Sequence, residues 1–242
     1  MLFSTMMKRV RVLIESVAFK GYGVARVDGK VVFVPYSVTG DEVWIEIKEE
    51  KKRYSTARLI QVLKPSPWRV LPPCSYFGTC GGCQWQHIDD STQVEQKKEI
   101  LGETIKRLGG MKDTPSISVV PSPKPYDYRA RVQMKIEKKA MGYYQEKSHR
   151  VVDVERCPIS HPLVNRLIEF LRDRLGALSH MEEVEMNVSP EEGQGVLLFH
   201  PRSYHPHSES FAKELLQSQP ILKGIAITQK ERHLLFGNPT LN

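Results

Sequence analysis

The sequence contains no apolar stretch long enough to cross a membrane. A membrane-spanning helix needs about 18 or more consecutive apolar residues, and no such run occurs among the 242 residues. The first residues, MLFSTMMKRVRVLI, contain neither a long apolar segment nor a small-residue cleavage site, so a secretory signal is not expected. These absences predict a cytoplasmic protein with no membrane partner.

Cysteine is also scarce, with four residues in the chain: Cys74, Cys80, Cys83 and Cys157. Without a secretory signal the thiols are expected to be reduced, although two disulfides or four unrelated buried thiols are the alternatives. Three of the thiols lie within ten residues, separated by glycines that allow the backbone to fold around a compact object. This spacing favours a metal site that the distant fourth thiol completes.

Zinc and iron–sulfur centres both use four thiolates. Zinc ribbons usually place their cysteines as two close pairs, whereas this chain has three cysteines together and one far away, followed at once by Pro158. A cubane cluster is wider than a zinc ion, and a Cys-Pro step also ends the bacterial ferredoxin motif. The pattern therefore favours a four-iron, four-sulfur cluster over zinc.

Negative charge is in deficit, with 28 Asp and Glu against 35 Lys and Arg and a net charge of +7. A basic surplus favours an anionic partner, and RNA or DNA fits this better than a membrane surface.

Residues 8–64 predict a small all-β unit. Five short runs rich in β-branched residues are separated by turn signals, among them the Asp28-Gly29 pair that favours a tight hairpin. Five strands in so short a segment suggest a barrel of the oligonucleotide-binding (OB) kind. The basic run 51–54 next to these strands is either an RNA contact or a solvated hairpin tip. Four prolines between residues 64 and 73 predict a stiff linker after the barrel.

The remainder of the chain predicts an α+β domain with an antiparallel sheet. A helix from about Ser91 to Leu108 has a narrow apolar stripe, and a second helix begins at Pro162. The strand that begins near residue 129 alternates apolar and polar residues, so its polar face carries a basic row. Lys and Arg on such a face would contact phosphates, and a neighbouring tyrosine would stack on a base. An ordinary solvated sheet face is the alternative.

Several stretches resemble one family, the RNA (uracil-5-)-methyltransferases. Residues 74–88 (CSYFGTCGGCQWQHI) resemble its cluster loop, and residues 21–43 (GYGVARVDGKVVFVPYSVTGDEV) resemble its TRAM domain. The joint PSPWRVLPPC and the segments YDYRARVQMK and MGYYQEKSHRVVDVERCPI resemble the parts that follow. The resemblance implies an OB-like TRAM barrel over residues 1–68 and an iron–sulfur-containing central domain over 69–90 and 117–242.

The resemblance also implies which residues act. It makes the four cysteines the ligands of a [4Fe-4S] cluster. Together with the strand pattern, it predicts these RNA contacts: Arg129, Arg131, Gln133, Lys135, Tyr144, His149 and Arg150. The family methylates carbon 5 of uridine with S-adenosylmethionine, and TRAM together with a cluster is typical of members that act on 23S ribosomal RNA.

The family's Rossmann-like methyltransferase domain is not evident in the sequence. No glycine-rich turn follows a strand where it could hold S-adenosylmethionine, and the four cysteines allotted to metal leave no nucleophile. We therefore expect a fragment without that domain, with no catalytic or cofactor-binding residue, inactive alone and using S-adenosylmethionine only as part of a full-length enzyme. Segment 91–116 would pack on the missing domain, or mediate self-association. The alternatives are a stand-alone RNA-binding protein with a zinc or iron–sulfur site, a tRNA uracil-5-methyltransferase, and an electron-transfer module.

Overall fold

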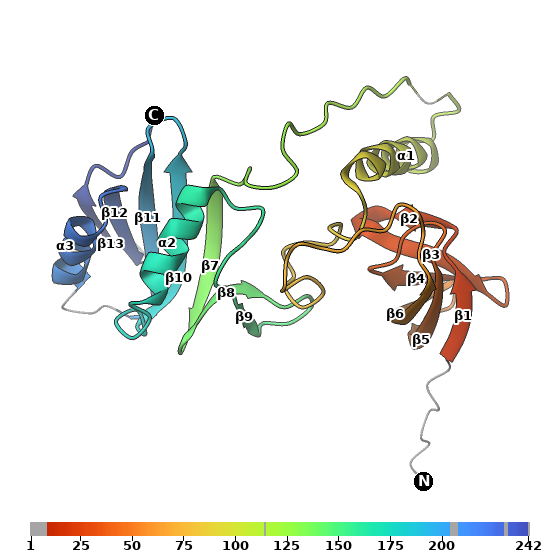
Figure 1. The fold of residues 1–242 in the computed structure, drawn as a ribbon, viewed down its shortest axis with the longest axis horizontal. Helices are drawn as coiled ribbons and strands as arrows, with labels where there is room; N and C mark the ends of the chain where they lie inside the picture. Colours follow the sequence, from red (N-terminus) through yellow and green to blue (C-terminus); the bar gives the residue numbers. More distant parts are fainter. Residues whose placement is uncertain (1–8, 114, 204–207, 230–231, 242) are drawn as a thin grey trace, which may run out of the picture. The chain divides into compact units, whose positions relative to one another are not determined.

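The computed structural model describes residues 9–113, 115–203, 208–229 and 232–241. The chain divides into two compact units, which are treated separately below (Figure 1). The first, called the barrel unit, comprises residues 1–78 and 83–122, and the second, called the sheet unit, comprises residues 79–82 and 123–242. Residues 69–78 and 83–90, which the sequence predicted to be part of the central domain, are thus grouped with the barrel.

Within the part of this unit that the structure describes, six strands and one 3-10 turn (Phe19–Gly21) form the barrel. The strands are β1 (Arg9–Leu13), β2 (Ser16–Ala18), β3 (Tyr22–Val27), β4 (Lys30–Pro35), β5 (Glu42–Glu50) and β6 (Tyr54–Lys64), in the order β1-β5-β6-β4-β3-β2. The two outermost strands, β1 and β2, are two halves of one bent run of chain. At the bend Ile14 donates its N–H to the Asp41 carbonyl while Glu15 donates to Val24, so one run pairs at both edges and closes the barrel.

The interior of the barrel follows from the alternation of the strand residues. On β5, Val43 and Ile45 are fully buried, whereas Trp44 between them is 37% exposed. Strands β1, β3, β4 and β6 also contribute buried residues. The complete buried set is Val12, Ile14, Ala25, Val32, Val34, Val43, Ile45 and Ala57. Because successive side chains of a strand point to opposite sides, the alternate apolar residues lie in the core, as the sequence predicted.

A buried ion pair fixes the proline-rich linker to the barrel. Asp41 is completely buried and accepts hydrogen bonds from the backbone N–H of Val38 (2.7 Å) and of Ser66 (2.9 Å). Arg69 binds the same carboxylate through Nε (3.0 Å) and Nη2, and Nη2 also donates to the Tyr36 carbonyl at 2.9 Å. Burial acts to raise the pKa of Asp41, but these hydrogen bonds outweigh it and lower the pKa below 3.8.

His87 lies at the same junction between the barrel and the following loop. Its side chain is 1% exposed, its Nε2 lies 3.3 Å from the Ser37 carbonyl oxygen, and its ring lies against Phe77 (5.5 Å between centroids). Because a carbonyl can only accept, Nε2 carries the proton of the neutral ring. Burial lowers the pKa of His87 to about 4.

We expect this histidine to make the barrel unit sensitive to mild acid. The folded pKa of about 4 lies below the ordinary value of 6.5, so the unfolded chain takes up the proton first. The contribution of the neutral His87 ring to the free energy of unfolding is therefore complete above pH 6.5 and is lost between pH 6.5 and 4. This contribution amounts to about 3 kcal/mol. Urea unfolding from pH 7.5 to 4.5 measures it. His87→Phe should flatten the profile in this range, and an unchanged slope would contradict the assignment.

Helix α1 (Asp90–Leu108) follows the loop and belongs to the barrel unit. Asp89 caps it by accepting the Thr92 N–H at 3.0 Å, so the helix begins one residue before the predicted start at about Ser91. The predicted apolar stripe is not buried: Leu101 is 47% and Leu108 84% exposed, and Val94 and Ile105 are half-buried. Self-association through this stripe stays a prediction.

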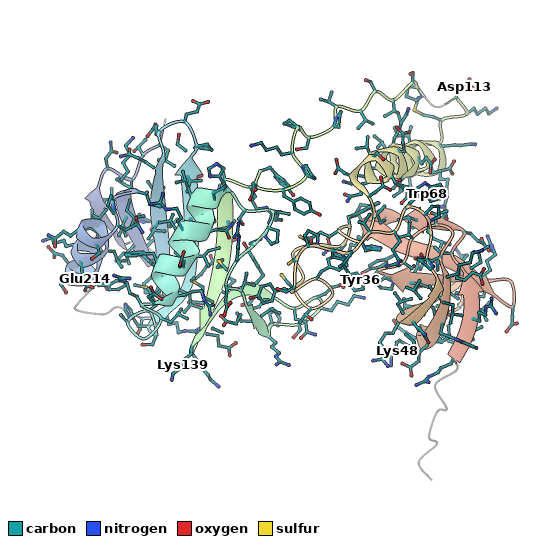
Figure 2. All side chains as sticks on the ribbon, viewed as in Figure 1. Tyr36, Lys48, Trp68, Asp113, Lys139 and Glu214 are labelled. Atoms are coloured by element: carbon teal, nitrogen blue, oxygen red, sulfur yellow. The ribbon has the colours of Figure 1, made fainter. Side chains whose placement is uncertain are left out.

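The described residues of the sheet unit form seven strands in the order β13-β12-β11-β10-β7-β8-β9. Its strands are β7 (Arg131–Glu137), β8 (Ala140–Tyr144), β9 (Val151–Asp153), β10 (Met181–Ser189), β11 (Gln194–Pro201), β12 (Leu222–Gln229) and β13 (Arg232–Gly237). Its helices are α2 (Pro162–Arg172) and α3 (Ser208–Ser218). Lys139 extends from the turn that joins β7 to β8, and Glu214 lies on α3 (Figure 2).

The predicted antiparallel sheet was wrong in one part of this unit. Strands β11 and β12 run parallel, with Val196 opposite Gly224 and Phe199 opposite Ile227. A parallel pair needs a crossover connection, and α3 lies between the two strands in sequence and contacts β12 and β13. The sheet is therefore mixed.

Both helices cover the same face of the sheet. A side chain at Gly195 would meet Leu167 of α2 at 3.1 Å, and the ring of Phe211 on α3 lies 6.1 Å from that of Phe199. Gly195 and Phe199 alternate with Leu198 and His200, so the latter two lie on the opposite side of β11. That opposite side of the sheet, which the two helices leave uncovered, is called the open face below. No helix among the described residues is both long and apolar enough to span a membrane.

Candidate functional site

The predicted basic row lies on the open face, but a row of carboxylates lies beside it. Arg131, Gln133 and Lys135 alternate on β7, and the paired strand β10 places Glu183 opposite Lys135 and Glu185 opposite Gln133. Arg131 forms an ion pair with Glu185 at 2.7 Å, while Lys135 and Gln133 both bind Glu183. The centre of the open face is therefore a lattice of paired charges rather than a purely positive strip.

The electrostatics of this lattice follow from its contacts. Hydrogen bonding from Arg131 lowers the pKa of Glu185, so that carboxylate is charged at neutral pH. Burial acts to lower the pKa of Lys135, but the bond to Glu183 outweighs it and the pKa is raised. Glu185 and Lys135 are therefore both charged at neutral pH. Arg131, whose side chain is 72% exposed, still presents its guanidinium to solvent.

His200 of β11 adds a third potential donor to the two glutamates. The ligand atoms of Glu183, Glu185 and His200 lie within 4.8 Å of one another, which is a spacing that a metal ion could use. The carboxylates are already bound by Arg131, Gln133 and Lys135, and the His200 Nε2 lies 3.2 Å from Glu185. The set is accordingly explained as an ion-pair cluster.

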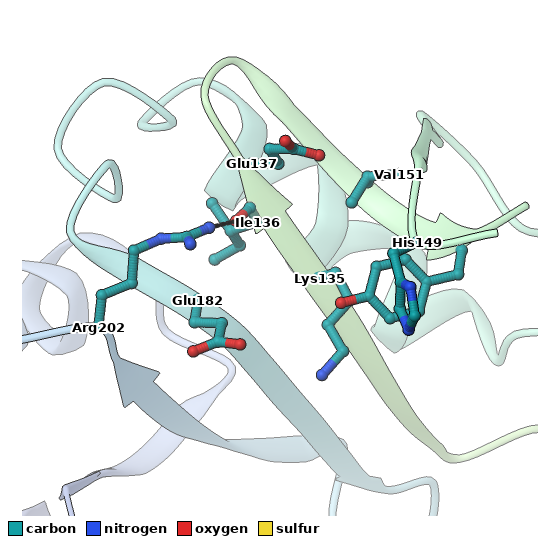
Figure 3. Close-up of a pocket in the computed structure, with 8 residues that line it drawn as sticks. Lys135, Ile136, Glu137, His149, Val151, Glu182 and Arg202 are labelled. Carbon is teal, nitrogen blue, oxygen red and sulfur yellow. Dashed lines mark hydrogen bonds between the residues drawn. The ribbon is translucent and has the colours of Figure 1, made fainter.

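The other predicted RNA contacts divide into two places. Tyr144 and His149 lie together, with their rings edge to face at 5.4 Å, and the Lys135 ammonium lies 5.6 Å from the Tyr144 ring centre. Arg150 follows His149 in the exposed turn and donates its backbone N–H to Ser148 Oγ. Lys135, at one end of the row, and this aromatic pair line one small cavity, drawn in Figure 3.

Arg129 lies elsewhere in the sheet unit, next to two of the cysteines. Its backbone N–H bonds the Ile159 carbonyl, just after Cys157 and Pro158. Burial raises the pKa of the nearby Tyr143 hydroxyl, the Cys157 and Cys80 thiols add to the rise, and the Arg129 charge opposes it. Cys80, Cys157 and Arg129 thus all surround one tyrosine.

The backbone around Cys157 and Cys80 is closely held. Asn165 of α2 accepts the Cys157 N–H at 2.9 Å and donates to the Cys157 carbonyl at 3.0 Å. Gly81 donates to the Tyr144 carbonyl at 2.9 Å, and a Cβ on Gly81 would lie 2.8 Å from that same oxygen. The N–H of Gly82 points at Cys80 Sγ (3.4 Å), the kind of amide–sulfur contact that stabilises a thiolate.

Cys74 and Cys83 belong to the barrel unit and are half-buried. Phe77 donates to the Cys74 carbonyl at 3.1 Å and so closes a turn directly after the first cysteine. None of the four cysteines, all within the described ranges, forms a disulfide. The donor chemistry fits an iron–sulfur cluster, since thiolates are its usual ligands and an amide already points at one of the sulfurs.

The sequence reasoning did not identify the acidic side of this surface. Glu182, Glu183 and Glu185 come from the segment MEEVEMNVS, and Arg202 follows β11. The alternation of Glu183, Glu185 and Asn187 with apolar residues was visible in the sequence and signals a half-buried strand. What the sequence did not show is that this strand pairs with the basic one.

Residues 10–68 match a family model described as the TRAM domain of tRNA (uracil(54)-C(5))-methyltransferase. The predicted TRAM domain is thereby confirmed for the barrel.

Similarity to known proteins extends beyond the barrel. An uncharacterized RNA methyltransferase of Aquifex aeolicus is 38% identical over 192 residues, which cover 79% of this chain and 45% of that protein. The 23S rRNA (uracil(1939)-C(5))-methyltransferase RlmD of Pectobacterium atrosepticum is 35% identical, over 88% of this chain and 49% of its own length. The resemblance to RNA uracil-5-methyltransferases is thus supported, and the chain spans about half the length of the curated relatives it matches.

A solved structure has the same fold. The tRNA (uracil-54, C5)-methyltransferase of Pyrococcus abyssi in complex with S-adenosyl-L-homocysteine matches with a TM-score of 0.69 and 22% identity, over 94% of this chain and 55% of that one. Nearly all of this chain therefore has a counterpart in a methyltransferase. This overturns the remaining part of the predicted fold class, the absence of a methyltransferase domain, and it removes the basis for predicting an inactive fragment.

Proposed function

We propose that this chain acts in S-adenosylmethionine-dependent RNA (uracil-5-)-methylation, in which it binds the RNA and carries an iron–sulfur cluster. The observation that supports it most directly is the combination of a TRAM barrel with the loop Cys74–Cys83 and the distant Cys157 in one chain whose relatives are RNA methyltransferases. The fold agrees with a methyltransferase solved with S-adenosyl-L-homocysteine, the product of S-adenosylmethionine.

The proposed substrate is 23S ribosomal RNA. A relative named for that activity is 35% identical over 88% of the chain, whereas the solved tRNA enzyme is 22% identical. A tRNA substrate is the second candidate, favoured by the TRAM model that matches the barrel. S-adenosylmethionine would supply the methyl group for carbon 5 of uridine in either RNA.

In this proposal the described residues bind and orient the RNA. On the barrel, Tyr54 is 38% exposed next to the β5–β6 turn, where its ring lies 5.6 Å from Phe33 and is available to a base. On the sheet unit, Arg131 offers its exposed guanidinium to a phosphate while Tyr144 and His149 offer rings. Paired carboxylates beside the basic row would limit non-specific phosphate binding and favour RNA that also fits the rings.

The four cysteines would hold a [4Fe-4S] cluster whose role is structural. Asn165 and the Gly82 amide fix two of the ligands in the sheet unit. The bound cluster would contribute iron–thiolate bonds that cross-link segments far apart in sequence. A reducing cytoplasm, the proposed location, keeps such thiols available to metal.

A methylation assay tests the proposed activity. The gene product that contains this chain is incubated with labelled S-adenosylmethionine and with unmodified transcripts of 23S rRNA or tRNA. We expect 5-methyluridine at one position of the 23S rRNA, and at no position of the tRNA. Label in the tRNA alone would favour the second candidate. No 5-methyluridine in either transcript would overturn the proposal, and one zinc per chain without sulfide would favour a stand-alone RNA-binding protein.

A further inference from the structure

A small cavity opens on the open face at the end of the β7–β8 hairpin. Its volume is about 150 Å³, and it is lined by strand residues of β7, β8, β9 and β10, by His149 and by Arg202. In Figure 3, Arg202 and Glu182 lie on one side, His149 on the other, and Lys135 between them. Pockets for drug-sized ligands measure about 300–1,000 Å³, so this cavity suits one planar ring system and is too small for a whole cofactor.

One wall of the cavity is aromatic. Tyr144 and His149 meet edge to face, with ring centres 5.4 Å apart, and the Lys135 ammonium lies 5.6 Å from the Tyr144 ring. The His149 side chain is exposed, so one face of its ring is accessible. An unstacked base stacks on such rings with little dependence on its identity. This wall therefore provides affinity for a base, and selectivity has to come from the other side.

The opposite wall carries Glu182, which a strand irregularity places there. In regular alternation Glu182 would share the helix-covered face with Val184, but the pairing of β10 with β11 shifts between Met181 and Glu183. Such bulges re-aim side chains, and here Glu182 lines the same cavity as Lys135. Glu183 is bound by Lys135 and Gln133, whereas Glu182 forms no ion pair or hydrogen bond with another described residue and interacts electrostatically with the nearby Lys135 ammonium. Its carboxylate remains available to a ligand.

Arg202 closes the same end of the cavity. Its backbone N–H bonds the His180 carbonyl at 2.9 Å, and its Nη2 donates to the Ile136 carbonyl at 2.7 Å. These two bonds fix the guanidinium against the edge of β7, as the dashed line in Figure 3 shows. The N–H groups that do not bind Ile136 can donate to a phosphate or to a base carbonyl.

We propose that this cavity binds a single unstacked guanine of the substrate RNA, an inference that rests on the proposed function. Guanine presents two adjacent N–H donors, N1–H and the 2-amino group, and a carboxylate accepts both at once. Adenine places an acceptor beside its amino group, and cytosine and uracil each offer one donor on that edge, so none of them matches Glu182 in this way. The base stacks on His149 beside Tyr144, and Arg202 can donate to a carbonyl of the base or to its phosphate.

Fluorescence anisotropy with short oligouridines that carry one central guanosine, inosine, adenosine or cytidine tests this selection. The wild-type chain should bind the guanosine oligomer about tenfold more tightly than the others. Inosine lacks the 2-amino group and should lose most of this advantage. Glu182→Gln should bind guanosine and inosine oligomers equally, because the amide repels one of the two donors. Glu191→Gln, an exposed glutamate in the β10–β11 turn, is the matched control and should retain the preference.

The possible outcomes distinguish a failure of the guanine site from a failure of the proposed function. Tight RNA binding without a guanosine preference, or a preference that survives Glu182→Gln, would overturn the guanine site and leave the RNA-binding function in place. No binding to any oligomer by a folded chain would overturn both. Circular dichroism of each variant establishes that a lost preference does not arise from unfolding, since Glu182 is exposed and its replacement leaves the core unchanged.

Discussion

Replacing Arg69 with methionine is expected to destabilise the barrel unit by about 3–5 kcal/mol. The substitution keeps most of the side-chain volume but leaves the completely buried carboxylate of Asp41 without its cation. It also removes the hydrogen bond from Nη2 to the Tyr36 carbonyl. The backbone amides of Val38 and Ser66 still bind Asp41, so we expect the lower end of this range. Urea unfolding followed by tryptophan fluorescence measures it.

A surface pair of the same chemistry provides the control. Arg11 binds Glu42 at 2.5 Å on the outside of the barrel, where the arginine side chain is 61% exposed, and Arg11→Met should cost less than about 1 kcal/mol. Adding Asp41→Asn to Arg69→Met should recover part of the loss, because it removes the buried charge. Equal losses for Arg11→Met and Arg69→Met would show that burial does not govern this pair.

The pH dependence of the Arg69 effect has a defined sign. The folded pKa of Asp41 is depressed below 3.8, so its stabilisation is present above that value and is lost as the pH falls through the folded pKa. The window lies below that of His87, whose contribution is lost between pH 6.5 and 4. The two groups can therefore be distinguished in a single acid titration.

Local chemistry explains why several elements were predictable from the sequence. The Asp-Gly turn at residues 28–29 does join β3 to β4, with both residues at positive φ. Pro162 marks the start of α2 where the structure has it, and α1 begins within one residue of the predicted Ser91. These signals depend on a few adjacent residues, and no distant contact has to be known to interpret them.

The pairing of distant strands explains what the sequence did not reveal. The basic row on β7 is neutralised because β10, some 50 positions later, pairs with it and places Glu183 and Glu185 opposite. The parallel pairing of β11 and β12 and the bulge at Glu182 likewise depend on register between strands. A period of two shows which residues share a face of one strand, but not which strand lies beside it.

The cysteine set was proposed from spacing and resemblance. The structure adds the local supports of Cys80 and Cys157, namely Gly81, Gly82 and Asn165, which spacing alone could not reveal. A glycine is required at position 81 because a Cβ there would lie 2.8 Å from the Tyr144 carbonyl oxygen. Such close backbone approach beside a predicted ligand accords with a loop shaped to hold a cluster.

Replacing Cys157 with alanine is expected to abolish the cluster. The wild-type chain, prepared without oxygen, should contain about four irons and four sulfides with a broad visible absorption, and the variant should contain almost none. Asn165 binds only the backbone N–H and carbonyl of Cys157, so alanine preserves those bonds and the loss reports on the thiol rather than on local unfolding. Ser75→Ala, an exposed residue of the same loop, is the control and should keep the full iron content.

The same variant distinguishes a structural role from the alternatives. A bound cluster adds iron–thiolate bonds that exist only in the folded protein, so it should raise the thermal stability. We expect calorimetry to show a higher melting temperature for the cluster-bound protein than for Cys157→Ala. One zinc per chain without sulfide would show a zinc site instead of the cluster. Full iron and sulfide in Cys157→Ala would remove Cys157 from the ligand set, and equal melting temperatures of the two proteins would show that the cluster has no structural role.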